Sequence, residues 1–117
     1  MTIRSRAKPT YSLDDAKRMA KEGKLRIYGR AEDFIIANEG EQAYRLVADL
    51  IQSIEPEDFH KSDELNIRPG TFADIYRHVP YVSILSGELN EWYVKFFIDE
   101  GMVKVHVLSA NYEGAIH

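Results

Sequence analysis

The sequence predicts an α+β fold in which N-terminal helices pack on one face of an antiparallel β-sheet and leave the other face open. Apolar residues at helical spacing occur only in the first half of the chain. Apolar and polar residues alternate through much of the second half, as in strands with one buried face. Helices followed by strands are typical of the α+β class rather than of alternating βαβ units.

The composition limits the class of protein. A chain of 117 residues with 44% hydrophobic residues fits a single domain, residues 1–117, that can bury a core. The absence of cysteine excludes disulfides and thiolate zinc sites, and it favours the cytoplasm. No apolar run has the length of a membrane helix, and the start of the chain lacks the apolar core of a signal peptide. We therefore expect a cytoplasmic protein with no membrane partner.

Charge is distributed unevenly along the chain. The formal net charge is −4, yet the first thirty residues hold nine Lys or Arg against three acidic residues. This basic end could steer a polyanion toward the protein, or it could be an ordinary solvated helix. Charge alone leaves both interpretations open.

The N-terminal third predicts a loose arm followed by a helix. Residues 1–10 are polar and contain Pro9, so we expect them to be flexible. Ser12 is a suitable N-cap with Asp15 three residues later, and the helix should end at Lys21 or Glu22, before Gly23. Its apolar stripe is Leu13, Ala16, Met19 and Ala20. Residues 24–28 are expected to be extended.

The clearest helix covers residues 41–53. Its apolar positions follow the spacing i, i+3, i+4, i+7, i+8, which is wide enough to cover a sheet face, and Pro56 ends it. These positions are Ala43, Leu46, Val47, Leu50 and Ile51. The segment 31–38 predicts a further short helix.

Residues 57–65 and 71–79 predict two strands joined by a turn near Pro69 and Gly70. Residues 81–90 predict a loop, with a short strand at residues 81–85 as the alternative. Strict alternation in the second strand gives two sides, neither of them cleanly apolar. One side holds Phe72, Asp74, Tyr76 and His78, and the other holds Thr71, Ala73, Ile75, Arg77 and Val79.

Residues 91–110 predict a β-hairpin with Glu100 and Gly101 as a two-residue turn. That turn pairs residues whose numbers sum to 201, so Lys95 lies opposite His106. The apolar side, which should face the core, consists of Trp92, Val94, Phe96, Ile98, Val103, Val105 and Val107. The other side gathers Tyr93, Lys95, Lys104 and His106.

The residues on that second side suit RNA cleavage without a metal. The sequence has no glycine-rich phosphate loop and no histidine spacing typical of metal ligands, so we expect neither a cofactor nor a metal. Cleaving RNA through its 2′-OH needs a base, cations that stabilise the phosphorane, and an acid for the leaving oxygen. Histidine, lysine and tyrosine can supply these groups, although a solvated strand surface carries the same residue types.

The order of motifs resembles the MqsR family of type II toxin–antitoxin toxins. The similarity covers residues 8–108 and begins with KPTYSLDDAKRMAKEGKLRI, a short helix that ends in Gly before a basic strand. It continues through AYRLVADLIQSIEPEDFHKS, which contains the DFxKS pattern of the family, and through FADIYR and WYVKF. The resemblance implies a RelE-like α+β toxin that cuts mRNA without a metal and is neutralised by a cognate antitoxin.

The resemblance also implies site residues. The family's catalytic Lys in DFxKS falls on Lys61, and its hairpin Tyr falls on Tyr93. Two positions depart from the family: its Gln in the strand FADIYR is Ala73 here, and its C-terminal Lys falls on or near Leu108. Because His106 lies beside Lys95 in the predicted register, we hypothesise that it is the general acid or base that these departures leave missing.

The sequence thus predicts an mRNA-cleaving toxin with catalytic residues Lys61, Tyr93 and His106. Arg77, Lys95 and Lys104 are candidate RNA contacts, although Arg77 could instead bridge Asp74 or Asp58. Two alternatives stay open: a catalytically inactive module that binds an antitoxin-like partner, and an RNA-binding regulator that uses the basic first thirty residues.

Overall fold

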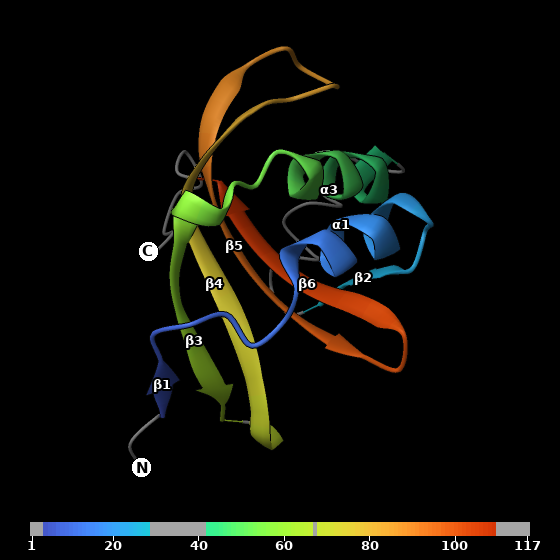
Figure 1. The fold of residues 1–117 in the computed structure, drawn as a ribbon. Helices are drawn as coiled ribbons and strands as arrows, with labels where there is room; N and C mark the ends of the chain where they lie inside the picture. Colours follow the sequence, from blue (N-terminus) through green and yellow to red (C-terminus); the bar gives the residue numbers. More distant parts are fainter. Residues whose placement is uncertain (1–3, 29–41, 67, 110–117) are drawn as a thin grey trace.

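The computed structural model describes residues 4–28, 42–66 and 68–109. One six-stranded sheet runs in the order β1–β3–β4–β5–β6–β2, with the helices beside it (Figure 1). The strands are β1 (Ser5–Arg6), β2 (Leu25–Ile27), β3 (Phe59–Leu65), β4 (Arg68–Val82), β5 (Leu89–Asp99) and β6 (Met102–Ser109). The helices are α1 (Leu13–Lys21), α3 (Ala43–Gln52) and the 3-10 helix η2 (Pro56–Asp58). The predicted α+β class is confirmed.

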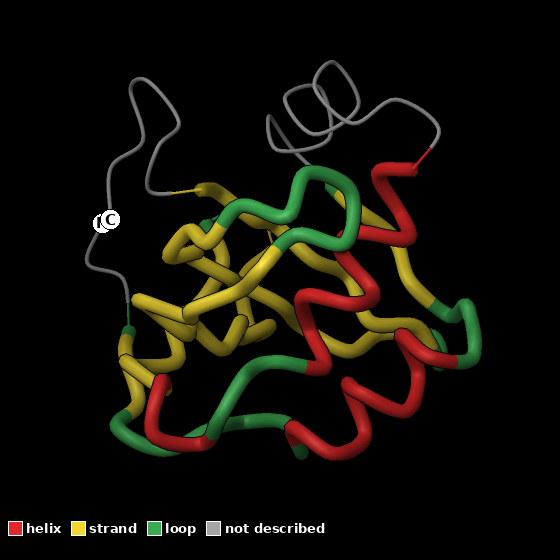
Figure 2. The backbone as a smooth tube through the Cα atoms, turned by 90° about the horizontal axis from the view of Figure 1, so that it is seen from above, coloured by secondary structure: helices red, strands yellow, loops and turns green. Residues whose placement is uncertain are grey.

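Both α-helices lie on the same side of the sheet, as the view from above shows (Figure 2). We call this side the covered face and the opposite side, which no described helix covers, the open face. The main hydrophobic core joins Ala16 of α1 and Leu50 of α3 to the covered face, where Phe96 and Val105 are fully buried. The predicted packing of the helices on one face is therefore confirmed.

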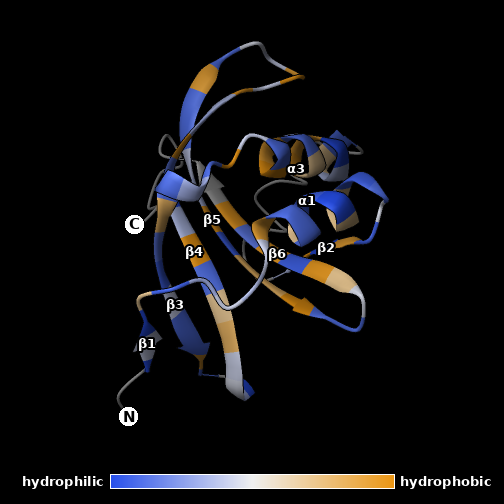
Figure 3. Cartoon of the chain, viewed as in Figure 1, coloured by the Kyte–Doolittle hydropathy of each residue, from blue (hydrophilic) through white to orange (hydrophobic). Residues whose placement is uncertain are grey.

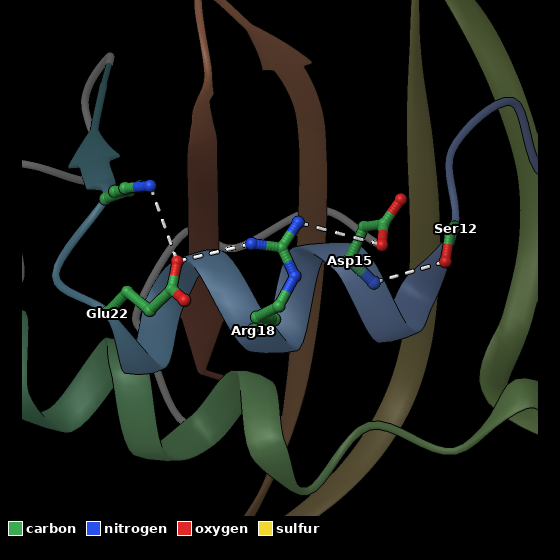
Figure 4. Close-up of polar contacts among 5 residues, drawn as sticks. Ser12, Asp15, Arg18 and Glu22 are labelled. Carbon is green, nitrogen blue, oxygen red and sulfur yellow. Dashed lines mark hydrogen bonds and ion pairs between the residues drawn. The ribbon is translucent and has the colours of Figure 1, made fainter.

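The helix α1 begins and ends where the sequence predicts. The Ser12 hydroxyl accepts a hydrogen bond from the backbone N–H of Asp15 at 3.1 Å (Figure 4). Arg18 lies between Asp15 and Glu22 on the outer surface, at 3.8 and 3.2 Å. Gly23, with a φ of 80°, adopts the left-handed conformation that ends the helix.

The helix α3 also matches its prediction. All five apolar residues of its stripe are buried: Ala43, Leu46, Val47, Leu50 and Ile51. The chain then enters η2 at Pro56, where the Asp58 carboxylate accepts a hydrogen bond from the Glu55 backbone N–H at 2.9 Å.

The β5–β6 hairpin has the predicted register. Lys95 lies opposite His106, Phe96 opposite Val105 and Ile98 opposite Val103. The two turn residues, Glu100 and Gly101, have φ values of 54° and 74°, which is the left-handed pair expected of a type I′ turn. Hydrophobic and hydrophilic residues alternate along the sheet strands (Figure 3).

The sheet is mixed, so the prediction of a purely antiparallel sheet is wrong. β2 pairs in parallel with β6, placing Leu25 opposite Val103 and Ile27 opposite Val105. After α1 crosses the covered face, the chain returns through β2 along the outer edge of β6. Because this pairing joins segments nearly eighty positions apart, no local pattern in the sequence indicates it.

The strand β4 is longer and less regular than predicted. It starts at Arg68, so Pro69 and Gly70 lie within the strand, and the chain turns at Asn66. Tyr76 lies opposite Val94 whereas Val79 lies opposite Trp92, so β4 contains one extra residue. This bulge, where His78 has a φ of 57°, reverses the alternation. Val79 therefore joins Tyr76 in the covered core instead of lying on the opposite side.

The segment predicted as a loop, residues 81–90, is strand at its two ends and a loop between them. Tyr81 and Val82 end β4, Leu89 and Asn90 begin β5, and the connection between them is residues 83–88. The four residues pair across the two strands. Buried Tyr81 supplies part of the reason, because its hydroxyl donates to the Asp49 carboxylate of α3 at 2.9 Å.

Residues 4–10, predicted as part of a flexible arm, are instead docked on the sheet. β1 pairs antiparallel with β3, and the Arg4 guanidinium contacts the Glu64 carboxylate. The fully buried Asp74 carboxylate accepts the backbone N–H groups of Thr10 and Tyr11, both at 2.9 Å. These contacts could not be read from the polar composition of the segment.

The helix predicted for residues 31–38 lies outside the described residues. Within the described ranges, neither helix has the length and apolar character needed to span a membrane.

Candidate functional site

Four strands align the predicted site residues in one row across the sheet. Lys61 of β3 lies opposite Ile75 of β4, Ile75 opposite Lys95 of β5, and Lys95 opposite His106 of β6. Directly opposed residues point to the same face, so this row lies on the open face. With strands about 4.8 Å apart, the Lys61 and His106 backbones are roughly 14 Å from each other.

A hollow of about 270 Å³ opens at the His106 end of the row. Tyr93 lies two residues before Lys95 on β5, so it points to the same face. The residues lining the hollow are Tyr28, Leu65, Asn66, Tyr93, Lys95 and His106. Beneath it, Leu65, Ala73 and Phe97 form a second, smaller hydrophobic cluster. The hollow therefore has an apolar base and polar groups at its walls.

The environment of His106 favours its neutral form. Burial lowers its pKa below the ordinary 6.5, a hydrogen bond to the Tyr28 backbone raises it, and the Lys95 charge lowers it further. The imidazole is half-buried and its ring centre lies 5.8 Å from that of Tyr28. At neutral pH His106 is thus a potential proton acceptor.

Lys95 and Tyr93 are both protonated neighbours of His106. Burial and the nearby Lys61 charge lower the pKa of Lys95, while Asp63 raises it. Burial and Asp63 raise the pKa of Tyr93, so its hydroxyl keeps its proton, although Arg77 opposes this shift. Lys95 forms no ion pair within the described part of the chain. Its charge is available to an anion.

Lys61 is already paired. Its ammonium lies 3.2 Å from the Asp63 carboxylate, which also accepts a hydrogen bond from the Ser5 hydroxyl of β1 at 2.6 Å. The edge strand β1 therefore helps to hold the carboxylate that positions Lys61. An incoming phosphate would have to share the ammonium with Asp63.

Arg77 makes neither of the two bridges considered for it. Asp74 is occupied by backbone N–H groups on the covered face, and Asp58 accepts from Glu55. Arg77 makes no ion pair with any described residue, and it lines a separate hollow of about 250 Å³ with Asp58, His60 and His78. Its charge lowers the pKa of Tyr93, which places Arg77 near the row.

Lys104 lies on the open face as predicted, but Asp99 neutralises it. Its ammonium donates to the Asp99 carboxylate at 3.0 Å, and Arg68 donates to the same oxygen at 2.9 Å. Lys104 is therefore less suited to RNA contact than Lys95 is.

The sequence did not indicate two polar residues of the hollow, Tyr28 and Asn66, nor the apolar Leu65 beside them. Tyr28 reaches the site only because β2 pairs with β6, where its backbone N–H donates to the Val105 carbonyl at 3.0 Å. Asn66 reaches it because β3 and β4 turn one residue after Leu65. Neither position carries a local signal.

Ala73, where the resembled family has Gln, is fully buried opposite Asp63. It packs with Leu65 and Phe97 at the base of the hollow, so this position supplies no polar group. Within the described residues, no three His, Asp or Glu side chains gather as metal ligands would. Comparisons with protein families and with characterised proteins found no match to this chain.

Proposed function

We propose that this protein is a metal-independent endoribonuclease that cleaves mRNA in the cytoplasm. The observation that supports this most is the cross-strand row of Lys61, Lys95 and His106 with Tyr93 beside it. The row brings together a neutral base, two cations and a protonated hydroxyl on one accessible face. These are the groups that transfer of a phosphoryl group to a 2′-OH needs.

In the proposed reaction His106 removes the proton from a ribose 2′-OH. The freed oxygen forms a bond to the adjacent phosphorus, and Lys95 and Lys61 stabilise the negative charge of the phosphorane. The bond from phosphorus to the 5′-oxygen then breaks, and that oxygen takes a proton from Tyr93. The products are a 2′,3′-cyclic phosphate and a 5′-OH end, and no oxidant, metal or second substrate is consumed.

The proposal extends to biological role through the motifs that resemble the MqsR family. An α+β fold with helices on one face and a cationic open face is compatible with a RelE-like toxin. We infer on the same basis that a cognate antitoxin protein binds the chain and blocks RNA cleavage. The docked β1 strand leaves a sheet edge beside Lys61, where such a partner would have direct access to the row.

The experiment is to incubate the purified full-length protein with mixed mRNA in excess EDTA and to map the new ends. The proposal predicts discrete cuts that carry 5′-OH and cyclic phosphate ends. A matched sample of the His106→Ala variant controls for contaminating nucleases. Intact RNA with the wild-type protein, or cuts that persist unchanged with the variant, would refute the proposal.

Two observations favour a second candidate, an RNA-binding module without catalysis. The Lys61 ammonium is engaged by Asp63, and Ala73 offers no polar group where the family has Gln. Such a module would bind single-stranded RNA with an affinity that falls steeply as salt rises, and it would leave the RNA uncut. The EDTA experiment combined with a binding titration separates the two candidates.

A further inference from the structure

The hollow at the end of the catalytic row has a composition that phosphate chemistry alone does not require. Its volume of about 270 Å³ lies just below the roughly 300–1,000 Å³ typical of sites for drug-sized ligands. A hollow of this size can hold one planar heterocycle. The anionic RNA backbone needs cations, yet three of the six lining residues are Tyr28, Tyr93 and Leu65.

Tyr28 is held firmly as one wall. Its ring packs edge-on against Phe97 with centroids 5.6 Å apart, and it lies 5.8 Å from the His106 ring. Burial raises the pKa of the Tyr28 hydroxyl, and the nearby Tyr93 raises it further. Because the pKa of Tyr93 is raised as well, both hydroxyls keep their protons at neutral pH. Rigid aromatic walls of this kind stack unpaired bases in proteins that bind single-stranded RNA.

Asn66 supplies hydrogen-bonding groups that could recognise the base. It is exposed at the β3–β4 turn, lines the same hollow, and makes no side-chain hydrogen bond to any described residue. A primary amide offers one acceptor and two donor hydrogens, which can pair with the edge of a nucleobase. Only an unpaired base exposes its Watson–Crick edge to such a group.

We propose that this hollow is a base-specificity subsite that takes one unpaired nucleobase of single-stranded RNA, stacked by Tyr28 and Tyr93 and read by Asn66. The inference rests on the proposed ribonuclease function and adds a substrate class: RNA with a flipped or single-stranded base next to the cut. Because His106 forms part of the same wall, the base in the hollow sets which 2′-OH faces the imidazole. The cut would therefore fall beside a preferred base.

The test measures binding rather than cleavage. Pentanucleotides of sequence UUNUU, with each of the four bases at N, are made with 2′-O-methyl groups that cannot attack phosphorus. Their affinity for the full-length wild-type protein is measured by fluorescence anisotropy. An A-form duplex of the same sequence is the structural control. The subsite predicts that the single strands bind more tightly than the duplex and that the four bases are ranked.

Three variants identify the residues. Tyr28→Leu removes the stacking ring and should weaken binding by about 5- to 150-fold, whereas Tyr28→Phe keeps the ring and should bind nearly as wild type. Tyr44→Leu, an exposed tyrosine on α3, is the matched control and should have no effect. Asn66→Ala should level the ranking of the four bases, and Asn66→Asp, which removes the donors, should favour bases that present donors.

The outcomes separate this inference from the ribonuclease proposal. Ranked, Asn66-dependent binding without any cleavage of ordinary RNA would support the subsite and refute the enzyme. If the wild-type protein cleaves RNA and neither Asn66→Ala nor Tyr28→Leu changes its ranking of the four bases, the subsite is refuted. The ribonuclease proposal would then still hold. If Tyr28→Leu fails to fold, the Tyr28→Phe and Asn66 variants still decide, because an unchanged ranking in Asn66→Ala and Asn66→Asp overturns the subsite.

Discussion

The two faces of the sheet use alternate residues of the same strands for different purposes. On the covered face, Val94 and Phe96 are fully buried under the helices. On the open face their neighbour Lys95 is half-buried, has a lowered pKa and faces His106. Adjacent positions on β5 therefore serve the core and, in the proposed function, the chemistry. We therefore expect substitutions under the helices to affect mainly stability, and substitutions of the polar open-face residues to affect mainly the proposed activity.

The largest expected effect is the loss of RNA cleavage when residues of the open face are substituted. We expect His106→Ala to slow RNA cleavage about 100- to 10,000-fold, because it removes the proton acceptor. Lys61→Ala should also reduce the rate strongly, because a cation on the phosphorane is lost. Initial rates on a defined RNA, together with growth arrest on expression, measure both effects.

The control for these variants is Lys17→Ala on α1, which removes a charge on the helix side. It should cleave RNA at the wild-type rate. Lys17→Ala should unfold within about 0.5 kcal/mol of wild type, as surface substitutions do. Urea unfolding of the two open-face variants shows whether they are folded under the assay conditions, since His106 is half-buried and Lys61 is ion-paired. Wild-type activity in both open-face variants would remove the catalytic assignment.

The next largest expected effect is a loss of stability when a core residue of the covered face is substituted. Leu50→Ala should lower the free energy of unfolding by about 2–5 kcal/mol, because it leaves a cavity in the core between α3 and the sheet. Leu89→Ala is the matched control, since Leu89 is 67% exposed at the start of β5. Urea unfolding measures both, and an equal loss in the two variants would contradict the layered core.

A smaller stability effect is expected at Asp74, a buried polar residue of the covered face. Asp74→Asn turns an amide donor toward the backbone N–H of Thr10 or Tyr11, so it should cost about 1–3 kcal/mol. Hydrogen exchange should show faster exchange at those two amides. Asp14→Asn, exposed on α1, is the control. Unchanged exchange would show that the N-terminal segment is not held by this carboxylate.

The smallest expected effect is a shift of the pH profile. His106 acts as a base only when neutral, and its pKa is lowered below 6.5, so cleavage should hold steady through neutral pH and fall at acidic pH. Lys95→Met removes a charge that lowers this pKa, and the acid limb should therefore move to higher pH. The pH dependence of kcat/KM and an NMR titration of the imidazole measure the shift. A limb that stays in place or moves lower would contradict the role of Lys95.

The features that local pattern determines could be predicted. The turn at Glu100 and Gly101 sets the β5–β6 register, and that register places Lys95 beside His106. The cap at Ser12 and the apolar stripe of α3 determine the helices in the same way. Each of these features depends on residues close together in the chain.

The features that depend on distant contacts could not be predicted. The parallel β2–β6 pairing and the docking of residues 4–10 join segments far apart in the chain. The bulge at His78 arises within β4 where it pairs with β5. Tyr28 and Asn66 enter the hollow through such pairings. The ion pairs of Lys61 with Asp63 and of Lys104 with Asp99 depend on side-chain conformations that a sequence does not specify.

The most direct test is to locate the RNA-binding surface by NMR on isotopically labelled protein. A non-cleavable 2′-O-methyl pentanucleotide is titrated into the full-length chain, and amide shifts are followed. The account predicts the largest shifts at Lys61, Tyr93, Lys95 and His106 on the open face, with little change along α3. Shifts confined to the basic helix α1, with the open face unperturbed, would show that RNA binds elsewhere and would contradict the central claim.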